Sequence, residues 1–218
     1  MAIQEKPQKP LLRGVLHEAA FFVFLLGGVG LLTLASVTRT QLVLLLVYVM
    51  SMLGLFGISA LLHRRNWSQV GRQRMRRLDH SMIFVAIAAT YTAVAGLVLH
   101  GVLEAVVLSL VWTGTLVGIV LRLLWIDAPK PIVAIPYLVV GWMAVIALPQ
   151  LFSALGVAGF LFLVGGGISY TVGAVVYARR RPDPFPLVFG YHEVFHALVI
   201  VGAIAEFVVI AFFAVSSK

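Results

Sequence analysis

The sequence contains no cysteine, and this absence limits the chemistry open to the protein. Disulfide bonds, thiolate metal sites and cysteine nucleophiles are excluded, so any metal ion must be bound by histidine or carboxylate side chains. Charged residues are also scarce, at 11% of the 218 residues, whereas 61% are hydrophobic. The mean hydropathy of +1.06 is too high for a soluble domain of this size. We therefore expect an integral membrane protein.

A polar linker, an internal repeat and a low-complexity segment are also missing, which predicts one domain over residues 1–218. The chain starts with the polar, proline-containing segment MAIQEKPQKP, and no short apolar core with a small-residue cleavage site follows. We therefore expect no cleavable signal peptide and a short cytoplasmic tail at residues 1–12.

Apolar stretches long enough to cross a bilayer recur along the chain, given that a spanning helix needs roughly 20 apolar residues. There are seven, at residues 15–37, 42–62, 80–99, 103–125, 132–150, 154–177 and 193–215. The separation is weakest between the third and fourth, at His100 and Gly101, and between the fifth and sixth, near Pro149 and Gln150. The expected fold class is all-α, a bundle of seven transmembrane helices.

Basic residues concentrate at alternate ends of these predicted helices. One side collects Lys6, Lys9, Arg13, Arg64, Arg65, Arg72, Arg74, Arg76, Arg77, Lys130, Arg179, Arg180 and Arg181. The opposite side has only Arg39, with Lys218 at the C-terminus. The positive-inside rule predicts a cytoplasmic N-terminus and an outer C-terminus. We interpret the arginine-rich loop as a topology anchor that contacts anionic lipid, and do not expect nucleic acid as a partner.

Five of the six histidines are predicted near the cytoplasmic ends of four helices, where ionisable residues are costly and mark functional sites. His192 and His196 in YHEVFH are one helical turn apart, so both can bind one ion. His63, at the end of the second span, can supply a third imidazole and leave one tetrahedral position open. The sequence thus predicts a zinc site at His63, His192 and His196.

Two further polar residues are predicted at the depth of this zinc site. Asp79 can accept a hydrogen bond from a water at the metal, and Ser59 can orient His63 or help hold a substrate carbonyl oxygen. Zinc in such a site activates water and polarises a carbonyl. We therefore predict catalytic roles for Asp79 and Ser59. His17 is an alternative ligand or a supporting neighbour, and His80 is expected to contact lipid headgroups.

Residues 192–196 also match the H-E-x-x-H motif of zinc peptidases, in which the glutamate is the general base. Membrane metalloproteases typically complete that site with a carboxylate from a later helix. Here only Glu206 follows, about 15 Å further along the same helix. Proteolysis is therefore disfavoured, and Glu193 is expected to be a solvated residue in the first turn of the seventh helix, where the helix dipole favours it.

The ordered set of these residues resembles the hemolysin III branch of the PAQR (progestin and adipoQ receptor) family. The matching elements are Ser59-x-x-x-His63, Asp79, His192-x-x-x-His196 and the segments KPLLRGVLHEAAFF and LDHSMIFVAIAATYT. The resemblance covers almost the whole chain. It implies seven helices, a cytoplasmic N-terminus and Zn²⁺ bound near the cytoplasmic face by the three histidines. Likeness to the bacterial members implies a multi-pass protein of the inner (plasma) membrane.

The resemblance also implies a function in membrane lipid homeostasis, with membrane lipids as partners. The leading hypothesis is a ceramidase-like zinc hydrolase of lipid amides or esters. A receptor-like or lipid-sensing bundle with a structural zinc is the alternative, as is a haemolytic pore, although no helix carries a polar stripe through the membrane. Many family members carry a fuller Glu- and Asn-rich motif in the first helix, where this chain offers only His17 and Glu18. The oligomeric state is left open.

Overall fold

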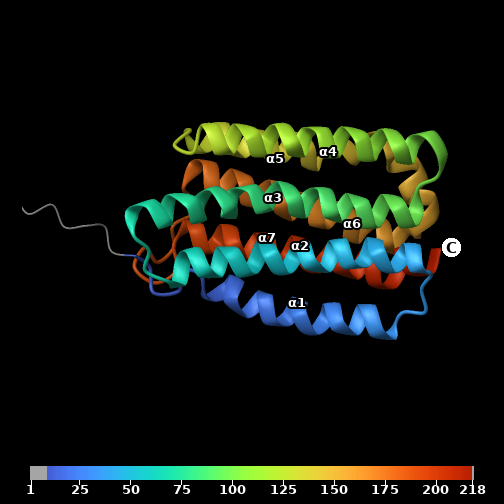
Figure 1. The fold of residues 1–218 in the computed structure, drawn as a ribbon, viewed down its shortest axis with the longest axis horizontal. Coiled ribbons are helices and arrows are strands. Elements are labelled where there is room, and N and C mark those ends of the chain that lie inside the picture. The colour runs from blue at the N-terminus through green and yellow to red at the C-terminus, as the bar shows by residue number, and fades with distance from the viewer. Residues whose placement is uncertain (1–8, 218) are drawn as a thin grey trace, which may run out of the picture.

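The computed structural model describes residues 9–217, and its helices lie side by side in one bundle (Figure 1). In chain order the elements are α1 (Val15–Leu34), α2 (Arg39–Arg64), α3 (Gln69–Val98), α4 (Gly101–Leu124), α5 (Lys130–Gly141), the 3₁₀ helix η1 (Met143–Ala147), α6 (Leu148–Arg179), α7 (Tyr191–Val208), the π-helical η2 (Val209–Ala214) and the 3₁₀ turn η3 (Val215–Ser217). No strand occurs within residues 9–217, which confirms the all-α class. In this part of the chain, six helices are long and apolar enough to cross a membrane, with Lys130–Arg179 taken as one segment.

The arginine-rich segment after α2 is largely helical, although the sequence predicted a loop up to residue 80. Ser68 caps α3 by accepting a hydrogen bond from the Gly71 amide at 3.1 Å, and the helix continues without interruption into the apolar part. Glutamine, arginine and methionine are good helix formers, so a polar extension of α3 costs little outside the membrane. The connection between α2 and α3 is thus reduced to a few residues before the Ser68 cap.

The segment Lys130–Arg179 is interrupted twice. Its first break is η1, and the second is at Gly156, whose φ of 64° and ψ of −179° lie outside the helical region. Trp142 Nε1 donates a hydrogen bond to Thr171 Oγ1 at 3.0 Å, so the chain before Gly156 lies beside the chain after it. Pro149, expected near a boundary, lies in the first turn of α6 just after η1, where a missing amide hydrogen is tolerated.

The basic segments gather at one end of the bundle, on the left of Figure 1. The amides of Leu11 and Leu12 donate to the carbonyl oxygens of Leu187 and Val188, at 3.0 and 3.1 Å, which joins the chain before α1 to the connection between α6 and α7. The described chain starts at this basic end and finishes at the opposite end (Figure 1). Helix α1 packs against both α2 and α7, and at the basic end the last turn of α2 lies beside the first turn of α7, where the His63 and His192 rings approach each other.

Candidate metal centre

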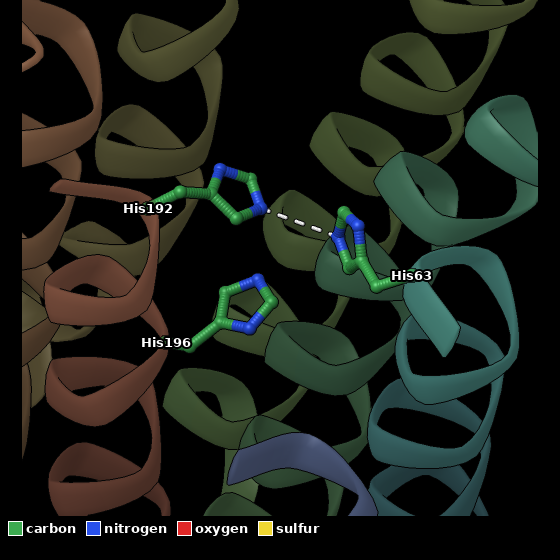
Figure 2. A group of neighbouring side chains, drawn as sticks. All are labelled: His63, His192 and His196. Atoms are coloured by element: carbon green, nitrogen blue, oxygen red, sulfur yellow. Dashed lines mark hydrogen bonds between the residues drawn. The ribbon is translucent and has the colours of Figure 1, made fainter. Parts of the chain in front are cut away.

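Three histidine side chains converge at the basic end of the bundle (Figure 2). His63 is in the last turn of α2, and His192 and His196 are on one face of the first turns of α7. The two Nε2 atoms of His63 and His192 are 3.2 Å apart, and one ring nitrogen from each of the three histidines lies within 4.8 Å of the others. The structure therefore brings together the three residues that the sequence predicted as ligands.

The arrangement fits a bound metal ion. Two nitrogens held at about 2.1 Å by a tetrahedral zinc are separated by roughly 3.4 Å, close to the spacing of His63 and His192. His196 is buried, and its Nδ1 atom has no hydrogen-bond partner among the described residues. A buried ring nitrogen without a partner is costly, and an ordered water would relieve that cost. The His196 nitrogen that faces the other two rings is the opposite one, Nε2, which is left for a metal ion (Figure 2). The cluster can thus hold a metal ion.

His17 lies against this cluster without joining it. Its ring stacks on that of His196, with the centroids 3.7 Å apart and the planes 4° from parallel, and only 3% of the residue is exposed. The nitrogens that converge are those of the other three histidines. Between the two roles considered for His17, ligand or supporting neighbour, the geometry favours the neighbour, because stacking fixes the orientation of the His196 ring.

Glu193 is buried, so the expectation of a solvated residue was wrong. Only 1% of it is exposed, its Oε1 accepts a hydrogen bond from Arg13 Nε, and its Oε2 accepts one from the Gly190 amide at 2.9 Å. The position in the first turn of α7 is as predicted. One carboxylate oxygen pairs with Arg13 and the other caps the helix. Both oxygens therefore have structural partners, and Glu193 is not available as a base.

The expected lipid-headgroup contact of His80 is also replaced by a contact within the protein. Its Nδ1 lies 2.6 Å from a terminal nitrogen of Arg122, a buried arginine on α4 whose other bonds go to backbone carbonyl oxygens. Arg122 is inside the fourth predicted span, so it did not contribute to the prediction of membrane orientation from the basic residues. Its buried position depends on how α3 and α4 pack, which a single sequence does not reveal.

A cavity of about 160 Å³ adjoins the histidine cluster. Ser59, Asp79, His192 and His196 line it on one side, and most of the remaining lining is apolar. The side chains of Ser59 and Asp79 lie close enough to interact. The two residues predicted to act beside the metal thus lie together at the cavity, next to two of its three histidines.

Basic side chains cover the outer side of the cluster. Lys9 Nζ donates to the carbonyl oxygen of His63, which ends α2 with a cation near the negative end of the helix dipole. Partial burial lowers the pKa of Lys9, and the nearby guanidinium groups, first that of Arg72, lower it further. In the sequence analysis, Lys9 and Arg13 served only to predict which end of the bundle is cytoplasmic. Their contacts with His63 and Glu193 could not be inferred, because both partners are distant in the chain.

Comparison with known proteins gives a consistent match over most of the chain. A family model described as haemolysin-III related matches residues 6–207. The "Hemolysin-3 homolog" of Bacillus subtilis (strain 168) is 34% identical over 169 residues, which is 78% of this chain and 76% of that protein. The "Hemolysin-3" of Bacillus cereus is 30% identical over 176 residues, covering 81% of this chain and 77% of its own. The family match includes all three histidines of the cluster.

Proposed function

The chain belongs to the haemolysin III family, and from this membership and the site described above we propose that it is a zinc-dependent membrane hydrolase of lipid amides or esters. The six apolar helices support a multi-pass membrane protein. The observation that carries the proposal is the convergence of three imidazoles beside a largely apolar cavity that also contains Ser59 and Asp79. A structural metal site alone would not require a cavity with an acid and an apolar wall.

In the membrane, we place the basic end of the bundle in the cytoplasm and count seven crossings. The chain reverses around Gly156, so Lys130–Arg179 would cross twice, and seven crossings agree with described ends on opposite sides of the bundle. The clustering of arginine and lysine at one end supports the orientation. The similarity of this chain to bacterial proteins favours a location in the plasma membrane, where we propose a role in lipid homeostasis.

The ligands in this proposal are His63, His192 and His196, and imidazole-only sites suit zinc. Zinc bound there would supply Lewis-acid polarisation of a substrate carbonyl and would make a water molecule more acidic. The protein's own part is to hold the three rings in position. His17 does this through its stack on His196, whereas the Glu193–Arg13 pair stabilises the start of α7 as a whole.

Asp79 is the proton acceptor in the proposed reaction. Water adds its oxygen to the carbonyl carbon of the amide or ester, and the Asp79 carboxylate takes the proton that this oxygen loses. The same carboxyl then gives the proton to the leaving amine or alkoxide as the bond to the carbonyl carbon breaks. Ser59 lies beside Asp79, which favours a role in orienting that carboxylate over a direct contact with the substrate oxygen.

The test uses purified protein in detergent micelles, with bound zinc measured directly and a fluorescent ceramide and a fluorescent lipid ester as substrates. Asp79→Asn should lose at least about a hundredfold in hydrolysis, in keeping with the worth of a general base, while its zinc content stays at the wild-type level. His63→Ala should lose zinc and hydrolysis together. Undiminished hydrolysis by Asp79→Asn would remove Asp79 from the mechanism.

A non-enzymatic, lipid-sensing bundle is the second candidate, and one observation favours it. The three ligands come from only α2 and α7, whose ends they would clamp together. In that case wild-type protein would bind zinc without hydrolysing either substrate, and chelation would lower the melting temperature while Asp79→Asn had no effect on any measured property.

A further inference from the structure

A second ionisable group, Glu206, lies deep in the bundle and is not used by the proposed reaction. It is on α7, ten residues after His196 and therefore roughly 15 Å from it along the helix. Only 6% of the residue is exposed, yet it lines both the 160 Å³ cavity and a neighbouring cavity of about 90 Å³. Its Oε2 atom has no hydrogen-bond partner, and among residues 9–217 it forms no ion pair.

Two tyrosines accompany this carboxyl group. Tyr170 of α6 lines the 160 Å³ cavity together with Glu206, and its hydroxyl makes no hydrogen bond within the described chain. Tyr48 of α2 is fully buried behind them, and its hydroxyl also lacks a partner. By contrast, the third tyrosine near Glu206, Tyr91, donates to the Gly141 carbonyl at 2.7 Å and accepts from the Ala144 amide at 2.8 Å.

Two glycines make room for Glu206 and Tyr170, and each glycine lies on the helix that faces the residue it accommodates. A Cβ atom at Gly166 of α6 would lie 2.9 Å from Glu206 Oε1, and one at Gly202 of α7 would lie 2.7 Å from the ring of Tyr170. Each glycine is one helical turn before the polar residue of its own helix. Each helix thus has a glycine at the point where the other helix places a polar side chain. This is a site formed by the packing of α6 and α7, not an isolated polar residue.

Such a site needs a polar occupant. Carboxyl and phenol groups in a membrane interior are costly when they lack partners, and they are tolerated where a ligand or an internal cavity satisfies them. A metal cation would need several oxygen ligands, whereas the cavity wall here is mostly apolar. A hydroxyl group fits the available atoms, because it can donate to Glu206 Oε2 and accept from the Tyr170 hydroxyl.

We propose that Glu206 and Tyr170 bind a hydroxyl group carried on the hydrocarbon chain of a lipid ligand. The apolar wall between the two ends of the cavity holds the chain, and the deep site selects ligands hydroxylated well away from the head. The orientation, with the head at the histidines and the hydroxyl roughly 15 Å away, rests on the proposed function. The π-helical turn η2 begins three residues after Glu206, and such turns are frequent near functional sites.

The test measures binding of free fatty acids to zinc-loaded protein in detergent micelles, by displacement of a fluorescent fatty acid. The test ligands are stearic acid and a series of hydroxystearic acids with the hydroxyl near the carboxyl group, in mid-chain or at the chain end. These ligands contain no amide or ester bond, so the result does not depend on hydrolysis. Wild-type protein should bind the mid-chain hydroxy acid roughly tenfold more tightly than stearic acid.

Glu206→Gln and Tyr170→Phe should each reduce this preference severalfold or more while stearic acid binds as before. Two variants serve as controls. Tyr137→Phe removes a hydroxyl nearer the histidine end of the same cavity, and Glu104→Gln alters an acid on α4 that lines neither cavity. Both should keep the wild-type preference. Should Glu206→Gln not fold, Tyr170→Phe decides the matter alone.

Equal affinity of wild-type protein for stearic and mid-chain hydroxystearic acid would overturn the inference and leave water as the occupant. So would a preference that survives in both variants, or one confined to a hydroxyl beside the carboxyl group. None of these results bears on hydrolysis, and loss of hydrolysis in Asp79→Asn does not bear on the hydroxyl preference, so the two proposals fail separately.

Discussion

His196 is the residue on which most contacts of the candidate site converge. One face of its ring packs on His17, and the ring also lies beside those of His63 and His192, with centroid distances of 5.2 and 4.5 Å. A ligand ring held on one face has less rotational freedom to lose when a metal binds. In the proposed site, His17 would therefore position the ligand His196.

Replacing His17 by alanine tests this role. His17→Ala leaves a space beside the His196 ring and should weaken zinc binding by about 10- to 100-fold, the range typical of groups that support a ligand. Competition with a zinc chelator measures the change. His17→Phe keeps a stacking ring and should restore most of the affinity. His100→Ala, at an exposed histidine outside the cluster, is the control. Complete loss of zinc in both His17 variants would make His17 a ligand.

The buried pair of Glu193 and Arg13 gives a second prediction at this scale. Glu193→Gln should keep zinc and hydrolysis but lower the free energy of unfolding by about 1–3 kcal/mol, because a partly buried arginine loses its charged partner. Thermal unfolding in detergent measures the shift. The matched control is Glu18→Gln, whose pair with Arg64 is 47% exposed on both sides and should be worth at most about 1 kcal/mol. Loss of hydrolysis with zinc retained would return Glu193 to the mechanism.

At the scale of elements, two glycine-dependent features escaped the sequence. In the segment Lys130–Arg179, the boundary expected near Pro149 agrees with the start of α6 after η1, where proline is compatible with a first helical turn. The second break, at Gly156, was not singled out, although its φ of 64° favours glycine. Gly166 and Gly202 leave room for polar side chains of the facing helix. That they accommodate Tyr170 and Glu206 depends on the register of α6 against α7, which the sequence does not specify.

Gly156→Ala tests whether the turn in α6 depends on its backbone conformation. No atom lies within 4 Å of a Cβ built at Gly156, so any cost must come from the backbone. We expect the variant to lose about 1–3 kcal/mol of stability, the usual cost of a non-glycine residue in this region. Gly30→Ala is a control of opposite sign. It also has open space but is inside α1, where alanine should stabilise by up to about 1 kcal/mol. Equal stability of Gly156→Ala and wild-type protein would contradict this account.

For the molecule as a whole, the sequence predicted what depends on composition and spacing. Apolar length indicated an all-helical membrane protein, and histidines one turn apart identified two of the three histidines in the cluster. His63 followed from its depth, because membrane thickness places the ends of successive helices at the same level. The surroundings of Glu193, His80 and Glu206 did not follow, because their burial and partners depend on which helix faces touch. The bilayer thus determines depth, whereas packing determines neighbours.

The proposed topology can be tested because the chain contains no cysteine, so a single introduced thiol reports one position without background. Ser36, Ser68 and Ser153 are exposed, and they lie between α1 and α2, at the start of α3 and beside Gly156. In intact cells an impermeant maleimide should label Ser36→Cys and Ser153→Cys, whereas Ser68→Cys should react only after permeabilisation. Labelling of Ser153→Cys is the decisive result, because only two crossings by Lys130–Arg179 bring the turn at Gly156 to the outer face. If Ser153→Cys reacted only after permeabilisation while Ser36→Cys reacted in intact cells, this segment would not reach the outer face, and the count of seven would be wrong.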